Sequence, residues 1–507
     1  MSMADFAANP VTLDELLATQ PAATPLMATP EWDGVVTVGE MRELAGAAAA
    51  YLAKNGVGPG DRIAVWGQNS VEWAMWLCAA AWRGAAVVAL HPMLGPDDLQ
   101  QMLTQCKPVW LIADEVARGR SLAGIARDVA PKVPGLRGVT VMPGADGAFD
   151  LSGIIDRKAT PPARLGQLEA PLNLQFTSGS TGKPKIVVLS HRALVINAVE
   201  TARASGIVAG DRLASPMPFV HAAGLSSGFI LALAVGALWC TSHRFRPDAL
   251  LAQINDHSCT VMQGVPTMFK GLMDHMDKTG AATPTLRLGF IGGAPCPPDL
   301  CQRGIDRLGL QHMAIVYGQT EFGPTISLTT GREPDDLALT SVGPVLPNTE
   351  VKLVDGEIWV RGRTMMNGYF ENDAANAATV TPDGWLRTGD LGRIDRFCLQ
   401  VTARLKELII RGGENISPYE VENALRDAPG VIDIVAVPLP SAHWGEEICA
   451  VLLGTPDLDA VRALAEQRLA RFRRPDRYIV RAEFPALPSG KVDRVAIKRA
   501  VNAGEWT

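Results

Sequence analysis

The sequence predicts an α/β protein with a large N-terminal domain and a small α+β C-terminal domain. Its 507 residues exceed what one hydrophobic core normally supports, so two or more domains are expected. Strand-like apolar runs alternate with helical segments in the first half of the chain, which predicts parallel sheets covered by helices. Beyond Gly343 short strands separated by turns indicate a small β subdomain. We place the domain boundary between Ala403 and Arg404, giving domains 1–403 and 404–507.

The N-terminal elements follow one another in regular alternation. An alanine-rich pattern from Gly39 to Asn55 predicts a helix, with Gly56 placed to end it. Alternating strands and helices are expected at 62–66, 71–83, 85–90, 97–106 and 109–112. The Gly- and Pro-rich stretch 143–170 predicts a surface connection, and 191–205 predicts a helix. Further signals at 259–269 and 286–295 indicate a second sheet packed on the first.

Composition and charge exclude several classes of protein. With 47% hydrophobic and 20% charged residues, the chain is typical of soluble globular proteins. A net charge of -6 argues against nucleic acid or an anionic membrane as the main partner. The eight cysteines are scattered, without the two-residue spacing of zinc or redox motifs, which is typical of a reducing cytoplasm.

Targeting signals are also not evident. The N-terminus lacks a basic region followed by an apolar run, so it does not predict a secretion signal. The apolar stretch 226–240 is shorter than the ~20 residues that a membrane span requires, and we expect a buried helix there. We therefore predict a cytoplasmic protein without a membrane span.

A Gly- and hydroxyl-rich loop between two apolar runs has the composition of a phosphate-binding loop. It places two glycines, four hydroxyls and an ammonium in seven consecutive residues: Thr177, Ser178, Gly179, Ser180, Thr181, Gly182 and Lys183. Glycine lets the backbone approach a ligand closely, and successive N–H groups can form an anion-binding concavity. Hydroxyl groups and the Lys183 ammonium add further donors and a positive charge.

Two alternative interpretations of this loop are weaker. A flexible Ser/Gly linker is seldom set tightly between two strand-like runs. A Walker P-loop needs four residues between its glycines and a Ser or Thr after its Lys. Here Gly179 and Gly182 are three apart, and Pro184 follows Lys183.

The stretch LQFTSGSTGKPKIVVLSH resembles the phosphate loop of the adenylate-forming superfamily, which includes acyl-CoA synthetases, luciferases and peptide-synthetase adenylation domains. Ile186 departs from the pattern, because a glycine is common at that position. The upstream stretch GVGPGDRIAVWGQNS also resembles this superfamily, as do the downstream motifs YGQTE, WLRTGD and LPSGKV. The resemblance thus extends over most of the chain and implies ATP, Mg²⁺ and CoA as cofactors or substrates.

The resemblance assigns roles to residues around the nucleotide. Tyr317 would cover adenine, Thr320 would contact the α-phosphate, and Glu321 would bind Mg²⁺, a cation that prefers hard oxygen ligands. Asp390 and Arg404 would bind the ribose hydroxyls. The other face of adenine would lie against the backbone of Gly292, Gly293, Ala294 and Pro295.

Lys491 is similar to the superfamily's adenylation lysine. Pro and Gly around it predict a turn that holds it at a loop tip, from where it would stabilise charge in the transition state. A thiol must enter the same site in the second half-reaction, and the superfamily solves this by rotating the C-terminal domain about a hinge, here Lys406. Gly412 and Gly413 would then line the CoA channel.

The resemblance also implies an apolar acyl pocket. Between Ala214 and Ser242 there is no acidic residue to pair with a substrate ammonium, so an α-amino acid is not the expected substrate. His221 is either a catalytic gate between the acyl pocket and the thiol channel or a hydrogen-bonded core residue, whereas His191 is expected to be structural. The predicted pocket residues are Phe219, His221, Ala222, Gly224, Val265, Met268, Gly318 and Gly323.

The leading hypothesis is an ATP-dependent acyl-CoA synthetase acting on an apolar acid in fatty acid or secondary metabolism. A stand-alone ligase that loads an acyl carrier protein would share its first step. A catalytically silent binding module is the non-enzymatic alternative, and the joint presence of Lys491, Glu321 and Asp390 argues against it. The sequence does not distinguish fatty, aryl and polycyclic acids, and it leaves the oligomeric state open, with a homodimer as one expectation.

Overall fold

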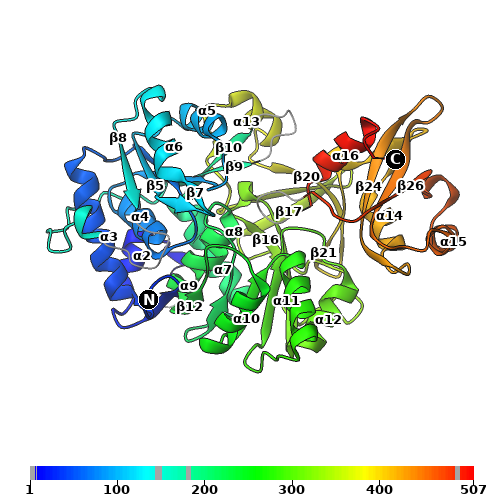
Figure 1. Cartoon of the computed structure of the whole chain (residues 1–507), viewed down its shortest axis with the longest axis horizontal. Coiled ribbons are helices and arrows are strands. Elements are labelled where there is room, and N and C mark those ends of the chain that lie inside the picture. Colours follow the sequence, from blue (N-terminus) through cyan, green and yellow to red (C-terminus); the bar gives the residue numbers. More distant parts are fainter. Residues whose placement is uncertain (1–5, 7, 143–150, 178–183, 486–491, 507) are drawn as a thin grey trace. The chain divides into compact units, whose positions relative to one another are not determined.

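The computed structural model describes residues 6, 8–142, 151–177, 184–485 and 492–506 (Figure 1). The chain divides into two compact units. Unit 1 comprises Met1–Leu339, Gly343–Glu350 and Arg361–Leu386, and unit 2 comprises Thr340–Val342, Val351–Val360 and Arg387–Thr507. The predicted α/β class, with a large N-terminal and a small C-terminal domain, is confirmed. The placement of the domain boundary between Ala403 and Arg404 stays a prediction.

The first sheet of unit 1 has seven strands. In order across the sheet they are β19 (Gly368–Tyr369), β10 (Lys185–Ser190), β9 (Pro171–Thr177), β4 (Ala86–Leu90), β3 (Arg62–Trp66), β5 (Trp110–Asp114) and β8 (Gly138–Met142). The strands from β9 to β8 pair in parallel, while β10 and β19 pair antiparallel at one edge. A two-stranded hairpin, β6 (Val116–Ala117) and β7 (Arg120–Ser121), follows β5.

The second sheet of unit 1 has eight strands. Across the sheet they are β16 (Thr325–Leu328), β15 (His312–Gly318), β14 (Leu288–Gly292), β13 (Val261–Gly264), β11 (Arg212–Ala214), β12 (Leu238–Cys240), β1 (Pro25–Ala28) and β2 (Val36–Thr37). Its inner pairs are parallel, and the outermost pairs on both sides are antiparallel. The two predicted sheets are therefore both present.

Helices cover and separate these sheets. They are α2 (Leu13–Thr19), α3 (Val38–Lys54), α4 (Val71–Trp82), α5 (Pro96–Cys106), α6 (Leu122–Val129), α7 (His191–Ser205), α8 (Ala222–Gly224), α9 (Leu231–Val235), α10 (Pro247–Asp256), α11 (Pro266–Thr279), α12 (Pro298–Leu308) and α13 (Asp373–Thr379). A capping box between Thr37 and Glu40 fixes the start of α3. Every residue of α4 is buried, which is typical of a helix enclosed on all sides.

The apolar stretch 226–240 lies in the interior of unit 1. It includes most of a π-helical segment, η3 (Leu225–Ile230), then α9 and β12, and all residues of these elements are buried. Among the residues that the structure describes, no helix combines the length and apolar character needed to cross a bilayer.

Two smaller sheets lie further along the chain. One contains β17 (Thr349–Val354), β18 (Glu357–Gly362), β20 (Leu386–Asp395) and β21 (Cys398–Arg404), and is the predicted small β subdomain. The other contains β23 (Glu414–Ile416), β22 (Ile409–Arg411), β25 (Gly445–Gly454), β24 (Val431–Ser441) and β26 (Arg477–Arg481). Unit 2 also contains α14 (Pro418–Leu425), α15 (Leu458–Arg468) and α16 (Arg494–Asn502). Short 3-10 turns are η1 (Ala130–Lys132), η2 (Leu151–Gly153), η4 (Thr320–Phe322), η5 (Leu405–Glu407) and η6 (Arg471–Arg473).

Candidate active site

The predicted phosphate loop connects two paired strands of unit 1. β9 ends at Thr177 and β10 begins at Lys185, and these two residues are opposite each other in the antiparallel pair. The other predicted loop residues lie outside the described part of the chain: Ser178, Gly179, Ser180, Thr181, Gly182 and Lys183. The structure therefore places the two ends of the loop side by side at one end of the sheet.

The predicted nucleotide residues Tyr317, Thr320 and Glu321 lie together at the end of β15. Tyr317 belongs to the last part of the strand, and Thr320 and Glu321 lie in η4. All three are half-buried. The carboxyl ends of the parallel strands β14 and β15 meet at this edge, which is where α/β sheets usually bind ligands.

The predicted adenine-binding backbone follows the neighbouring strand. Gly292 ends β14 and pairs with Val316, one residue before Tyr317. Gly293, Ala294 and Pro295 are exposed. Their exposed backbone thus follows a strand that adjoins the one carrying Tyr317, as the predicted adenine site requires.

Asn197 of α7 fixes the backbone of the turn that carries Thr320 and Glu321. Its Nδ2 donates to the carbonyl oxygens of Phe322, at 3.3 Å, and Thr325, at 2.7 Å. Its Oδ1 accepts from the backbone N–H of Thr325 at 3.1 Å. Asn197 is fully buried, so all three bonds are shielded from water. The sequence offered no signal for this role, because a polar residue inside a helix usually faces solvent.

Gly318 permits close packing within the same turn. A Cβ on Gly318 would lie 1.9 Å from the Pro324 carbonyl oxygen, so no other residue fits without moving the chain. Gly323 has a φ of +88° and lies against the Thr364 carbonyl and α7. In the structure both glycines shape the turn around Glu321; their predicted role in lining an acyl pocket stays a prediction.

Two side chains that the sequence analysis did not assign contact the Glu321 region. The Tyr369 hydroxyl donates to Glu321 Oε1 at 2.9 Å. Lys185 Nζ lies 4.5 Å from the centroid of the Tyr369 ring. Residues from three separated parts of the sequence therefore meet at the base of the phosphate loop.

The predicted acyl-pocket residues fall into two groups. The Phe219 ring is 1% exposed and stacks on Trp73 at a centroid distance of 4.2 Å, with Trp239 at 4.9 Å. It therefore belongs to an aromatic cluster in the core. By contrast, Val265 and Met268 form a small separate cluster of buried side chains with Met217. The partly buried side chains of Ala223 and Phe245 pack against this cluster.

His221 precedes α8 and is half-buried. Its carbonyl oxygen accepts from the N–H groups of Gly224, at 3.0 Å, and Leu225, at 3.1 Å, which starts the helical turn. Ala222 is buried in the same turn. A Cβ on Gly224 would lie 2.3 Å from the Pro218 carbonyl oxygen, so this turn requires a glycine.

His191 is fully buried at the start of α7, where its Nδ1 accepts from the Leu13 N–H at 3.0 Å. Burial lowers its pKa to about 4, so the imidazole is neutral. These features are those of a structural histidine.

In unit 2 the predicted ribose-binding residues form an ion pair. Asp390 on β20 pairs in register with Arg404 on β21. Arg404 Nε donates to Asp390 Oδ1 at 2.7 Å, and a second nitrogen lies 3.4 Å from Oδ2. Asp390 is 3% exposed, whereas about half of the Arg404 side chain is exposed. The carboxylate is thus oriented, and the guanidinium remains accessible.

The predicted hinge and CoA-channel residues lie close together in sequence. Lys406 lies in η5, and Gly412 and Gly413 form the tight turn between β22 and β23, with φ values of +60° and +89°. The Gly412 N–H donates to the Trp444 carbonyl at 2.7 Å. A Cβ on Gly412 would lie 2.9 Å from the Trp444 indole, which is about half exposed.

The predicted catalytic Lys491 lies outside the described residues. Two residues that flank the range 486–491 are hydrogen-bonded to each other: the Asp493 N–H donates to the Pro485 carbonyl oxygen at 2.8 Å. Asp493 also caps α16, accepting from the Ala496 N–H.

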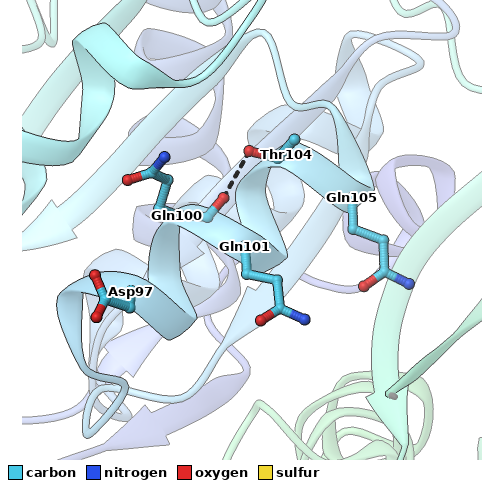
Figure 2. Close-up of a pocket in the computed structure, with 5 residues that line it drawn as sticks. All are labelled: Asp97, Gln100, Gln101, Thr104 and Gln105. Atoms are coloured by element: carbon cyan, nitrogen blue, oxygen red, sulfur yellow. Dashed lines mark hydrogen bonds between the residues drawn. The ribbon is translucent and has the colours of Figure 1, made fainter.

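A surface depression lined by polar side chains lies beside α5. Its described lining consists of one face of that helix: Asp97, Gln100, Gln101, Thr104 and Gln105 (Figure 2). Gln105 Nε2 donates to the Pro184 carbonyl at 3.2 Å, which ties α5 to the residue that follows the predicted phosphate loop. Within the described ranges, no group of three or more His, Cys, Asp or Glu side chains is arranged to hold a metal ion.

Comparison with known families decides the identity. The family described as "AMP-binding enzyme" matches residues 15–370, and "AMP-binding enzyme C-terminal domain" matches residues 420–491. The chain belongs to the AMP-binding enzyme family. The resemblance to adenylate-forming acyl-CoA synthetases is thereby confirmed.

Relatives and solved structures agree with this assignment. A Bacillus subtilis protein, YngI, provisionally named an acyl-CoA synthetase, is 32% identical, with 93% of this chain and 94% of that protein covered. A ligase of Mycobacterium tuberculosis named for joining CoA to 3-[(3aS,4S,7aS)-7a-methyl-1,5-dioxo-octahydro-1H-inden-4-yl]propanoate is 31% identical, covering 97% and 99% of the two chains. The structure of the anthranilate CoA ligase AuaEII with anthranoyl-AMP superposes with a TM-score of 0.88 and covers 100% of both chains. Its sequence is 20% identical to this chain, so this similarity supports the fold.

This AMP-binding enzyme is an AMP-forming acid–thiol ligase that makes acyl adenylates. Ligases of this family use ATP and CoA together with a small-molecule acid. The roles of individual site residues stay predictions.

Proposed function

We propose that this enzyme activates an apolar, bulky carboxylic acid as an acyl adenylate and transfers the acyl group to CoA. The cluster of Met217, Val265 and Met268 carries the proposal for an apolar acid, because it supplies only hydrocarbon and thioether surface. Methionine side chains adapt to irregular shapes, which suits a bulky group. The Mycobacterium tuberculosis relative, whose name specifies a two-ring acid, supports the same size class.

The first half-reaction needs positioning and charge stabilisation rather than a protein nucleophile. A carboxylate oxygen attacks the α-phosphorus of ATP, the bond to the β-phosphate oxygen breaks, and pyrophosphate leaves. We assign the phosphate loop 177–183 to the departing phosphates, Thr320 to the α-phosphate, and Lys491 to the charge that develops between carboxylate and phosphate.

Glu321 is suited to share a Mg²⁺ ion with the substrate phosphates. Its carboxylate is half-buried and oriented by Tyr369, and magnesium is commonly held by one or two carboxylates plus phosphate oxygens. Bound Mg²⁺ would neutralise phosphate charge. The adenine and ribose are assigned to Tyr317, the backbone 292–295, Asp390 and Arg404.

In the second half-reaction the CoA thiol attacks the acyl carbonyl carbon. The mixed anhydride bond to AMP breaks, AMP leaves, and the thiol proton is released. We propose rotation about Lys406 between the two steps, so that Gly412 and Gly413 replace Lys491 at the site. His221 is the candidate gate for thiol entry. An acyl carrier protein remains the alternative acceptor.

We place the enzyme in the cytoplasm. All eight cysteines are free thiols, and seven of them are buried, which supports a reducing compartment. A homodimer is the assembly to be tested by light scattering.

The proposal is tested by the fate of a labelled oxygen. With an ¹⁸O-labelled carboxylate drawn from fatty, aryl and fused-ring acids, one ¹⁸O atom is expected in AMP and none in pyrophosphate. Acyl-CoA should accumulate with free CoA, whereas transfer only to a phosphopantetheinylated carrier protein would favour the alternative. Label in pyrophosphate, or adenylation of amino acids in preference to apolar acids, would contradict the proposal.

A further inference from the structure

Tyr369 links Glu321 to the strand that follows the predicted phosphate loop. Its hydroxyl donates to Glu321 Oε1 at 2.9 Å, and Lys185 Nζ lies 4.5 Å from its ring centroid. Tyr369 belongs to β19, which pairs antiparallel with β10, where Val187 is its partner. Lys185 is the first residue of β10, opposite Thr177. The three side chains therefore form one chain of contacts at the end of the loop.

The Tyr369 backbone is rigidly held. Its N–H donates to Asn376 Oδ1 at 2.6 Å, and its carbonyl accepts from Asn376 Nδ2 at 3.2 Å. The main chain of Glu321 is fixed in the same region, because its carbonyl accepts from the Met366 N–H at 3.0 Å. With both backbones fixed, the hydroxyl–carboxylate bond selects one orientation of the Glu321 side chain.

The Tyr369 hydroxyl is the donor in this pair. The Tyr369 side chain is 6% exposed, and its hydroxyl faces a carboxylate oxygen, which can only accept. A phenol ordinarily keeps its proton at neutral pH. A carboxylate has about four acceptor positions, so one bond from Tyr369 leaves the other oxygen and further lone pairs for a cation.

We propose that Tyr369 is a positioning residue that orients the Glu321 carboxylate toward the metal–nucleotide complex. The inference rests on the proposed role of Glu321 and deepens it. The Tyr369 hydroxyl restricts the rotamers of Glu321, while the Lys185 ammonium holds the ring by a cation–π contact. Groups that orient a metal-binding carboxylate typically change metal affinity when they are removed.

The test uses Tyr369→Phe, which removes only the hydroxyl and keeps the ring beneath Lys185. Mn²⁺ serves as the probe, and its binding to the full-length protein with a non-hydrolysable ATP analogue is measured by electron paramagnetic resonance, without turnover. Roughly tenfold weaker Mn²⁺ binding is expected. The Mg²⁺ concentration for half-maximal pyrophosphate release should rise in parallel, with the KM for the acid unchanged.

Tyr51→Phe is the matched control. The Tyr51 hydroxyl is also partly buried in unit 1 and hydrogen-bonds to Thr140 Oγ1 at 2.9 Å. This substitution deletes the same atom away from Glu321, so Mn²⁺ binding should equal that of the wild type. Equal weakening in both variants would overturn the inference by indicating a general effect on the fold.

A double-mutant cycle tests whether Tyr369 acts through Glu321. Adding Tyr369→Phe to Glu321→Ala should produce no further loss of Mn²⁺ binding. A full additional loss, or wild-type binding by Tyr369→Phe alone, would overturn the inference. Neither result would affect acyl-CoA formation by the wild type; failure of the wild type to form acyl-CoA from any acid would instead overturn the proposed function.

Discussion

Replacing Asn197 is expected to disturb the turn that carries Thr320 and Glu321. Asn197→Ala deletes three buried hydrogen bonds and leaves one N–H and two carbonyl groups of Phe322 and Thr325 without this partner. Since each such loss destabilises by about 1 kcal/mol or more, the loss is on the order of 3 kcal/mol. We expect the turn to shift so that some of these unpaired groups find other partners, which recovers part of the lost stability. A displacement of about 1 Å at reacting groups lowers the rate about 100-fold.

The assay is acid-dependent exchange of labelled pyrophosphate into ATP, with thermal unfolding measured on the same preparations. Asn197→Asp provides a second substitution of the same shape. It keeps the acceptor for the Thr325 N–H but turns an oxygen toward the two carbonyls, so exchange should fall at least as far as in Asn197→Ala. Asn255→Ala is the surface control, because its exposed amide makes one 3.3 Å bond to the Ala282 carbonyl.

The melting temperature distinguishes a variant that is inactive because it unfolds from one that is folded but has a displaced turn. Both Asn197 variants should lose exchange activity at temperatures where they remain folded, while Asn255→Ala keeps the wild-type rate. Wild-type exchange by folded Asn197→Ala would refute the argument that this amide positions the Glu321 turn.

Three further predictions concern pH, substrate size and the two half-reactions. Burial raises the pKa of Glu72 to about 7 from 4.5, so the fold loses stability as pH rises from about 4.5 to 7, and the loss levels off above pH 7 at on the order of 3 kcal/mol at most. Glu72→Gln should therefore melt above the wild type at pH 8 and much closer to it at pH 5, and a pH-independent difference would contradict this. Phe245→Ala should raise kcat/KM for acids bulkier than the best wild-type substrate relative to smaller ones, and an unchanged ranking across a homologous series would contradict this. Lys491→Ala should lose adenylation far more than thioester formation from supplied acyl adenylate, and equal loss of both steps would argue against rotation about Lys406.

Much of the fold could be predicted because local patterns determine it. The strand at 62–66 and the helix at 191–205 occupy the predicted residues, and α4 ends one residue before the predicted end. Their apolar periodicity, N-caps and terminating glycines are all local signals. The predicted alternation then required sheets covered by helices, as the structure has them.

The contacts within the candidate site could not be predicted, because they join residues far apart in the sequence. Tyr369 lies 48 positions from Glu321, and Asn197 lies 128 from Thr325. No periodicity or motif marks either one in advance. The surroundings of Phe219 could not be predicted either, because its ring contacts Trp73 and Trp239, which come from distant helix and strand segments. Its assignment to the wall of an acyl pocket stays a prediction.

The central claim is that an apolar acid is adenylated and then passed to CoA. The most direct measurement is pyrophosphate release against a panel of fatty, aryl and fused-ring acids, each with and without CoA. We predict acid-dependent release that rises with CoA and yields AMP and thioester in equal amounts. A single burst of pyrophosphate that CoA does not change would contradict CoA as the acceptor, and release without any acid dependence would contradict adenylation itself.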